Sequence, residues 1–221
     1  MFTGIVQHIG KISSVKSASD GKTFVVSVVS SEFDGFKTVK TGDSIAINGL
    51  CTTVVSRNLN EFSVNLMNES LKRSTLNDFR TGDVVNLELA MSAADRFGGH
   101  IVTGHIDTVG CVQNIRNDGF SKVFTISADD KYVVQKGSIT LNGVSLTVSN
   151  VQKGLIDVSL IPHTLQNTTF QWLKQGDKIN VEFDILAKYI EKFTLLNHNE
   201  AQNIPENKPK IDENFLIENG F

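Results

Sequence analysis

The first half of the chain contains SIAINGLCTTV at residues 44–54, and the second half contains SITLNGVSLTV at residues 138–148. Each stretch places an Asn-Gly pair between two short runs rich in apolar and β-branched residues. Asn and Gly both adopt positive φ at little cost, so the pair favours a two-residue turn between antiparallel strands. The sequence therefore predicts one β-hairpin in each half, at Asn48-Gly49 and at Asn142-Gly143.

The similarity between the halves extends well beyond these hairpins. The offset of 94 positions also aligns residues 64–76 with 158–170 and residues 82–83 with 176–177. Near the start, FTGIVQHIG at 2–10 resembles VTGHIDTVG at 102–110, where the offset is 100. We therefore expect an insertion in the first half between Gly10 and Ser44, where residues 17–22 are expected to form a loop tip. Two such long repeats indicate a duplicated domain rather than a solenoid.

Each repeat predicts a small closed barrel of antiparallel strands. Short β-branched runs alternate with turn residues about every ten positions, which is typical of compact all-β domains. Around six short strands per half fit a closed barrel, because closure removes unpaired strand edges. The predicted fold is all-β: two homologous six-stranded antiparallel Greek-key barrels in tandem, plus a C-terminal helix. The expected boundaries are 1–97, 98–184, 185–197 for the helix and 198–221 for a mobile tail.

The C-terminal helix is predicted from apolar residues at helical spacing. Leu186, Tyr189, Ile190 and Phe193 fall on one stripe of a helix that starts near residue 185. Two closed barrels would already bury their own cores, so this stripe has no obvious partner within the chain. We therefore expect it to pack against other subunits.

Composition excludes several classes of function. The chain has 221 residues, 40% hydrophobic content and a formal charge of −3, without clustered lysines, so nucleic acid is not expected as a partner. No stretch approaches the roughly 20 apolar residues of a membrane span, and no signal peptide is recognisable, so we expect a cytoplasmic protein without membrane contact. Cys51 and Cys111 are expected to be free thiols. His100 and His105 lack the spacing and companions of a metal site, so no metal is expected.

Polar residues follow each predicted turn where a strand would ordinarily carry apolar ones. Side chains alternate along a strand, so Cys51 and Thr53 share one face, as do Ser145 and Thr147. The duplication thus predicts two matching polar niches.

With these motifs in place, the chain resembles the riboflavin synthase family, of the alpha-chain type, over nearly its whole length. The resemblance rests on the order and spacing of several short segments: 1–6, 48–51, 98–100, 103–107, 136–138, 143–147, 159–165 and 218–221. Thr52 departs from the family pattern, which has leucine there, and Leu89 replaces a frequent arginine. The Thr52 side chain should point away from Cys51.

The resemblance implies a reaction between two molecules of 6,7-dimethyl-8-ribityllumazine. One donates a four-carbon unit to the other, which gives riboflavin and 5-amino-6-(D-ribitylamino)uracil, without a cofactor, as the last step of riboflavin biosynthesis. Two similar pockets would present identical reactants to each other, and much of the rate would come from proximity and orientation. In the family each working site combines the first half of one chain with the second half of a neighbour in a homotrimer.

Carried over residue by residue, the resemblance implies two pockets, one for each half. The first would be lined by Gly4, Ile5, Val6, Cys51, Thr52, Thr53, Asn65, Leu66, Met67, Asn68, Glu69 and Ser70. The second would be lined by Gly104, His105, Ile106, Lys136, Ser145, Leu146, Thr147, Leu160, Ile161, Pro162, His163, Thr164, Leu165 and Asp184.

The expected catalytic residues are Cys51, Ser145 and His105, and each also has a simpler interpretation. Cys51 and Ser145 could assist deprotonation or nucleophilic addition on the substrates, although a buried free cysteine often only packs. His105 replaces Ile5 and could shuttle protons or merely donate a hydrogen bond. Lys136 could bind a substrate oxygen or simply be solvated, and Asp184 could hold ribityl hydroxyls or cap the helix.

A second class of function shares the same double barrel. Proteins of this kind also bind lumazine or flavin as optical antennae without catalysing a reaction. The presence of both Thr-Gly openings, at Gly4 and Gly104, together with Cys51 and Ser145 favours the enzyme, because a binding protein needs only one good pocket.

Overall fold

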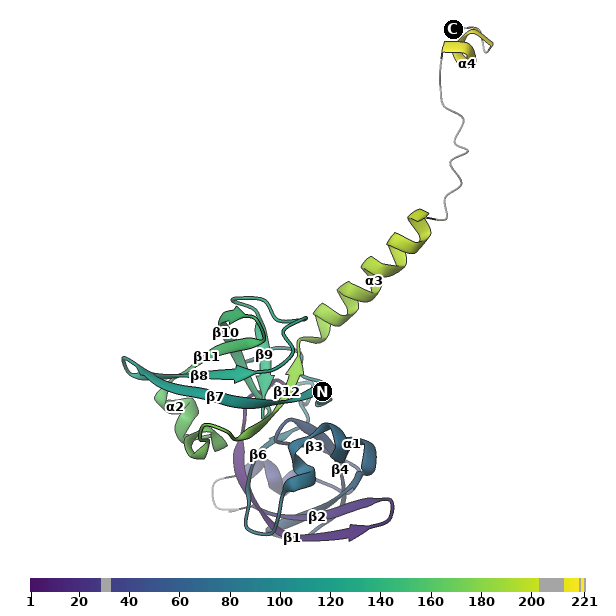
Figure 1. Cartoon of the computed structure of the whole chain (residues 1–221). Helices are drawn as coiled ribbons and strands as arrows, with labels where there is room; N and C mark the ends of the chain where they lie inside the picture. Colours follow the sequence, from purple (N-terminus) through teal and green to yellow (C-terminus); the bar gives the residue numbers. More distant parts are fainter. Residues whose placement is uncertain (29–32, 203–212, 219, 221) are drawn as a thin grey trace. The chain divides into compact units, whose positions relative to one another are not determined.

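The computed structural model describes residues 1–28, 33–202, 213–218 and 220 (Figure 1). The first half forms a closed barrel of six strands: β1 (His8–Ala18), β2 (Gly21–Val28), β3 (Ser44–Ile47), β4 (Leu50–Arg57), β5 (Glu61–Met67) and β6 (Val84–Leu89). Short helices connect some of these strands: η1 (Asp34–Thr38), α1 (Asn68–Arg73) and η2 (Thr75–Asp78).

The second half forms an equivalent six-stranded barrel. Its elements are β7 (Thr108–Asp118), β8 (Ser121–Ser127), β9 (Ser138–Leu141), β10 (Val144–Gln152), β11 (Leu155–Leu160), α2 (Pro162–Gln166), η3 (Thr169–Trp172) and β12 (Lys178–Phe183).

The strand order confirms the predicted barrel topology. Around the first barrel the order is β1-β2-β5-β4-β3-β6, and every pairing is antiparallel. Strands β3, β4 and β5 are consecutive neighbours, while β6 returns to lie beside β3, which is the Greek-key connection. The second barrel repeats this order with β7–β12.

The two predicted Asn-Gly hairpins are confirmed by backbone geometry. Asn48 and Gly49 have φ of 45° and 81°, and Asn142 and Gly143 have φ of 46° and 80°. Both central residues are therefore left-handed, as the tight turn between twisted antiparallel strands requires. These turns set the register in which Ile47 pairs with Leu50.

Each barrel encloses its own apolar core. Phe24 and Phe62 are buried in the first barrel, and Phe124 and Phe170 are buried in the second. Full burial of one such side chain contributes about 1.5–3 kcal/mol, so the alternating inward residues are a main source of stability for each barrel.

The insertion lies within the expected range between Gly10 and Ser44, and the expected loop tip at residues 17–22 is the end of the β1–β2 hairpin. Ala18 pairs with Gly21 in the first barrel and Asp118 pairs with Ser121 in the second, so residues 17–22 form a hairpin end that both repeats share. The offset is still 100 there and falls to 94 at Ser44 and Ser138. The additional residues of the first repeat therefore lie between Val28 and Ser44.

An asparagine network joins the two barrels. The side chain of Asn86 donates from Nδ2 to the carbonyl oxygen of Asn142 at 2.8 Å, and Oδ1 accepts the Thr169 amide at 2.7 Å. Asn180 makes the equivalent bonds to the Asn48 carbonyl and the Thr75 amide, at 2.9 and 2.7 Å. These reciprocal contacts relate the barrels by an approximate twofold axis.

Residues 186–221 form a separate unit. Helix α3 (Ile185–Gln202) starts as predicted but ends five residues beyond Asn197, and α4 (Glu213–Glu218) lies in the segment predicted to be a mobile tail. Part of that prediction concerns residues 203–212, 219 and 221, which lie outside the described residues. None of the described helices is long and apolar enough to cross a membrane.

Candidate functional site

The N-terminal segment and the segment between the barrels run side by side. Phe2 and Val102 form an antiparallel bridge, with amide-to-carbonyl distances of 2.8 and 3.2 Å. These residues occupy equivalent places in the two repeats, because their offset is 100. The bridge therefore lies near the approximate twofold axis, and each segment continues from it toward the other half of the molecule.

Two backbone hydrogen bonds show where these segments go. The amide of Cys51 donates to the carbonyl oxygen of Gly104 at 2.7 Å, and the amide of Ser145 donates to the carbonyl oxygen of Gly4 at 2.7 Å. We call Thr3-Gly4 and Thr103-Gly104 the Thr-Gly openings. The polar residue after each hairpin therefore contacts the Thr-Gly opening of the other repeat.

Both glycines are required by this close approach. A Cβ atom on Gly104 would lie 2.6 Å from Cβ of Cys51, and one on Gly4 would lie 2.6 Å from Cβ of Ser145. Their φ angles of 81° and 76° are also in the left-handed region. Steric exclusion and backbone conformation therefore both select glycine.

Each pocket therefore contains the Thr-Gly segment of the other repeat. The sequence had predicted that each pocket would contain the Thr-Gly segment of its own repeat. That prediction placed Gly4, Ile5 and Val6 beside Cys51, whereas the Gly4 segment in fact lies against the second barrel. Val6 packs on the second core, while Ile106 belongs to the first core. The correction follows from the crossing at the bridge, which residue spacing within one repeat does not reveal.

The first cavity, of about 470 Å³, opens beside Cys51. It combines residues of the first barrel with the opening of the second, and its lining includes seven of the predicted site residues: Cys51, Met67, Glu69, Ser70, Gly104, His105 and Ile106. Leu50, Arg73 and Asp107 complete the lining. The volume lies within the range of small-molecule sites.

Other predicted residues of the first pocket lie outside this lining. The buried Thr52 side chain donates to the Ile45 carbonyl at 2.8 Å and points away from Cys51, as expected. Leu66 is buried, and Thr53 is exposed. Asn65 accepts a hydrogen bond from Thr23 at 2.9 Å, and Asn68 donates to the Ser19 carbonyl at 3.2 Å.

The second polar niche is centred on Ser145. Ile5 lies on its opening and also lines a neighbouring cavity of about 320 Å³ with Glu88 and Gly98. Leu146 and Leu160 belong to the barrel core, and Leu165 packs against it. The remaining predicted residues near this end are exposed or half-buried: Thr147, Ile161, Pro162, His163 and Thr164. Lys136 is exposed with a φ of 67°, and Asp184 is half-buried.

Two buried glutamates hold the openings in place. Glu88 accepts hydrogen bonds from the Thr3 amide at 2.7 Å, the Thr3 hydroxyl at 2.9 Å and the Gly4 amide at 3.1 Å. Glu182 makes the equivalent contacts to Thr103 and Gly104, at 2.7 to 3.0 Å. Burial raises the pKa of Glu88, and the hydrogen bonds from Thr3 and Gly4 oppose that rise.

His100 completes the Ser145 niche. Its Nδ1 lies 2.7 Å from the Ser145 hydroxyl, and its Nε2 lies 3.1 Å from the Thr140 hydroxyl. Burial lowers the pKa of His100, and the charge of Asp184 partly counteracts this. A neutral imidazole has one nitrogen that accepts a hydrogen bond, so His100 can accept the Ser145 hydroxyl proton.

Sequence analysis did not assign a role to Glu88, Glu182 or His100. The signal was present for the glutamates, because both repeats carry Asn-x-Glu at matching positions inside apolar strands. A charge retained inside a barrel strand must have partners, and in both repeats the partner is a Thr-Gly opening. The His100 contact depends on the crossing of the segments and had no comparable signal.

Within the described part of the chain, the cysteines and acidic residues form no metal centre. Cys51 and Cys111 are both free thiols, as predicted. Among the residues described, no group of three or more His, Cys, Asp or Glu side chains could hold a metal ion.

Comparison with known proteins places the chain in one family. A family model described as the lumazine binding domain matches residues 3–90 and again 103–184. Curated riboflavin synthases match the full chain: that of Photobacterium phosphoreum is 43% identical over 100% of this chain and 99% of its own. The Bacillus subtilis enzyme is 40% identical over 100% of both chains.

Solved structures of similar fold contain bound ligands. LumP complexed with 6,7-dimethyl-8-(1'-D-ribityl)lumazine matches with a TM-score of 0.74 and 25% identity, covering 82% of this chain and 98% of LumP. LumP complexed with riboflavin matches with the same TM-score and identity, over 83% and 99%. The two domain matches and the full-length identities agree with the duplicated barrels. The chain therefore belongs to the riboflavin synthase family of proteins with paired lumazine binding domains.

Proposed function

We propose that this chain is a riboflavin synthase that converts two molecules of 6,7-dimethyl-8-ribityllumazine into riboflavin and 5-amino-6-(D-ribitylamino)uracil. The observation that carries the proposal is the pair of twofold-related niches, Cys51 with Gly104 and Ser145 with Gly4. A reaction between two identical molecules needs two similar binding sites, and the duplicated barrel supplies them. Full-length identity to curated riboflavin synthases supports the same conclusion.

The proposed chemistry balances without an external oxidant or reductant. One lumazine loses a proton from its C7 methyl group and becomes the carbon nucleophile. The other is activated when a nucleophile adds at C7, and it donates its four-carbon unit, which leaves the diaminopyrimidine as second product. The nucleophile leaves again and the proton is returned, so the atoms of two lumazines equal those of the two products. Donors around the pyrimidine carbonyls would stabilise the anion in the way an oxyanion hole does.

The differences between the niches suggest a division of labour. Ser145 has His100 at 2.7 Å, so its hydroxyl is suited to proton transfer or to assisting addition at C7. Cys51 lies beside His105 in the first cavity, where His105 could exchange a proton with the bound lumazine. Cys51, Ser145 and His105 are therefore the proposed catalytic residues, with His100 positioning Ser145.

We also propose that the working site joins two chains of a homotrimer in the cytoplasm. Leu186, Tyr189, Ile190 and Phe193 on α3 are each more than half exposed, which supports the predicted contact with other subunits. Ending the chain after Ala187 should leave folded barrels that bind lumazine but sediment as monomers with little activity. A monomer with full activity would refute the shared site and leave the barrel assignments intact.

Purified full-length protein tests the proposal directly. Incubation with the lumazine alone, in the presence of EDTA, should produce riboflavin, detected by its absorbance and fluorescence. A second candidate function is ligand binding without turnover, because the LumP structures hold lumazine and riboflavin on the same fold. Tight binding with no riboflavin formed would replace the enzyme proposal with that one.

A further inference from the structure

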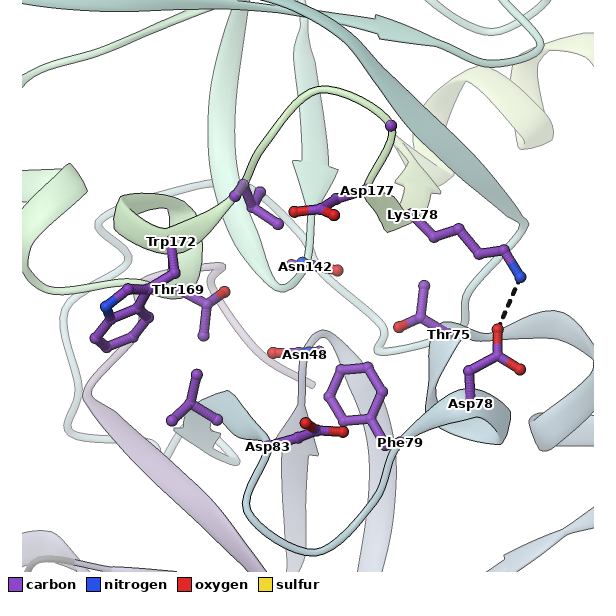
Figure 2. Close-up of a pocket in the computed structure, with 13 residues that line it drawn as sticks. Asn48, Thr75, Asp78, Phe79, Asp83, Asn142, Thr169, Trp172, Asp177 and Lys178 are labelled. Atoms are coloured by element: carbon purple, nitrogen blue, oxygen red, sulfur yellow. Dashed lines mark hydrogen bonds and ion pairs between the residues drawn. The ribbon is translucent and has the colours of Figure 1, made fainter.

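A cavity of about 450 Å³ lies between the two barrels and shares no lining residue with the cavities at Cys51 and Ile5 (Figure 2). Three residue types recur on its two sides at the repeat offset of 94: Asn48 and Asn142, Thr75 and Thr169, Asp83 and Asp177. The asparagines belong to the network that joins the barrels. The cavity therefore follows the same approximate twofold axis as the rest of the molecule, and its two sides offer the same polar groups.

Two buried hydroxyl groups in this cavity have no hydrogen-bond partner among the described residues. Thr75 and Thr169 are 5% and 6% exposed, and the Oγ1 atom of each is unsatisfied. Their backbone amides donate to the side chains of Asn180 and Asn86, so these amides have partners while the hydroxyls do not. Figure 2 shows both hydroxyls directed toward the interior of the cavity. An unpaired buried hydroxyl costs about 1–3 kcal/mol, so a bound donor would be favoured there.

Two carboxylates in the same cavity retain an oxygen to which no residue in the described part of the chain donates. One oxygen of Asp83 accepts the Arg80 amide at 2.7 Å, and one oxygen of Asp177 accepts the Lys174 amide at 2.7 Å. The remaining carboxylate, Asp78, is already paired with Lys178 at 2.7 Å. Asp83 is exposed and Asp177 is half-buried, so the cavity keeps two partly solvated negative charges, one on each side of the axis.

We propose that this cavity binds a small organic diammonium ion, with one ammonium group on each side of the axis. Each ammonium has three N–H donors, which can serve one aspartate and one threonine hydroxyl of the same repeat. The carbon spacer would lie beside the ring of Phe79, which Figure 2 shows facing the cavity. A metal ion is disfavoured because no suitable cluster of three ligand residues occurs in the described part of the chain.

Isothermal titration calorimetry on the full-length protein tests this site without any lumazine present. Straight-chain diamines of three to six carbons would be compared with butylamine at low and matched ionic strength, because salt screens charge pairing. At least one diamine should bind ten or more times more tightly than butylamine. Thr75→Val, which keeps the shape and removes the hydroxyl, should weaken the diamine several-fold.

Variants of aspartates inside and outside the cavity provide a matched comparison of diamine binding. Asp83→Asn and Asp177→Asn should each weaken diamine binding at least tenfold. Asp43→Asn is the control, since Asp43 accepts the Lys40 amide at 2.8 Å in the same kind of turn but lies outside the cavity. Riboflavin formation should be unchanged in all three, which shows that they fold. The proposal is overturned if no diamine binds, if butylamine binds equally well, or if Asp83→Asn behaves as Asp43→Asn does.

Discussion

The amide of Cys51 and the carbonyl oxygen of Gly104 are joined by a 2.7 Å hydrogen bond, although the two residues belong to different repeats. Ser145 and Gly4 form the equivalent pair at the same distance. Each site is therefore assembled from one barrel and the opening of the other. A chain carrying only one repeat would contain neither site in complete form.

Glycine substitutions should separate this close approach from backbone strain. Gly104→Ala would place Cβ 2.6 Å from Cys51, so lumazine binding beside Cys51 should fall at least tenfold. The control is Gly82→Ala, because Gly82 has a φ of 104° but nothing within 4 Å of the added Cβ. That control should lose about 1 kcal/mol of unfolding free energy and keep its activity. Equal binding by both variants would contradict the role given to Gly104.

Replacing one of the two buried glutamates with glutamine should loosen only the Thr-Gly opening that this glutamate holds. Glu88→Gln replaces one of two acceptors, either the Oε1 that accepts the Thr3 amide or the Oε2 that accepts the Gly4 amide, with an NH₂ donor. A donor is then left unpaired, which costs about 1–3 kcal/mol. Equilibrium dialysis should then show weakened lumazine binding at the Ser145 niche, and Glu182→Gln should weaken the other niche. Glu61→Gln, on the outer surface of β5, is the control. If a single variant weakened lumazine binding at both niches, the two openings would not be independent of each other.

The raised pKa of Glu88 also predicts a pH dependence of stability. The native carboxyl holds its proton at a higher pH than the unfolded one, whose pKa is near 4.5. The free energy of unfolding therefore decreases as pH rises from the unfolded pKa through the native pKa. Denaturant titration should show this decrease in the wild type and a smaller one in Glu88→Gln.

His100 should control the acidic side of the activity profile. Burial lowers its pKa below the usual 6.5, so the neutral form that accepts the Ser145 hydroxyl proton predominates at neutral pH. The kcat/KM ratio should fall only when the pH drops to the lowered pKa of His100, on the acidic side of 6.5, and His100→Gln should be slower at neutral pH and lack this decrease. An acidic limb that is unchanged in His100→Gln would show that another group is responsible.

Replacement of Cys51 tests whether its side chain takes part in the chemistry. Cys51→Ser should remain within roughly tenfold of the wild-type rate, because the other repeat already has Ser145 at this position. Cys51→Ala should lose about a hundredfold, as is usual when a group that moves protons is removed. Equal rates for the two variants, measured at saturating lumazine, would instead indicate a packing role.

Much of the fold could be predicted because its signals are local or repeated. The Asn-Gly pairs at Asn48 and Asn142 specify their own turns, and the offset of 94 shows the duplication directly. The sequence placed the insertion between Gly10 and Ser44, and the offset of 100 that persists through the β1–β2 and β7–β8 hairpins narrows it to the part after Val28. The end of α3 was placed too early because the apolar stripe stops before the helix does, and Glu200, Ala201 and Gln202 are good helix formers.

The residues that form the sites were easier to predict than which of these residues lie together in one site. Gly4 and Cys51 both lie in the first half, so their positions in the sequence suggest that they line the same pocket. The real partners are set by how the barrels pack, through the Phe2–Val102 bridge and the asparagine network. Such contacts join positions far apart in sequence and leave no periodic pattern. The glutamates of the two openings were the available clue, because each is a buried charge that requires partners.

The measurement that tests the account most directly is the stoichiometry of turnover by the purified chain. With 6,7-dimethyl-8-ribityllumazine as the only organic reactant, and with EDTA present, product analysis should give one riboflavin and one 5-amino-6-(D-ribitylamino)uracil for every two lumazines consumed. That ratio is required if two related sites hold the donor and the acceptor of one four-carbon unit. A ratio of one lumazine per riboflavin, or dependence on an added second reactant, would contradict the paired-site account.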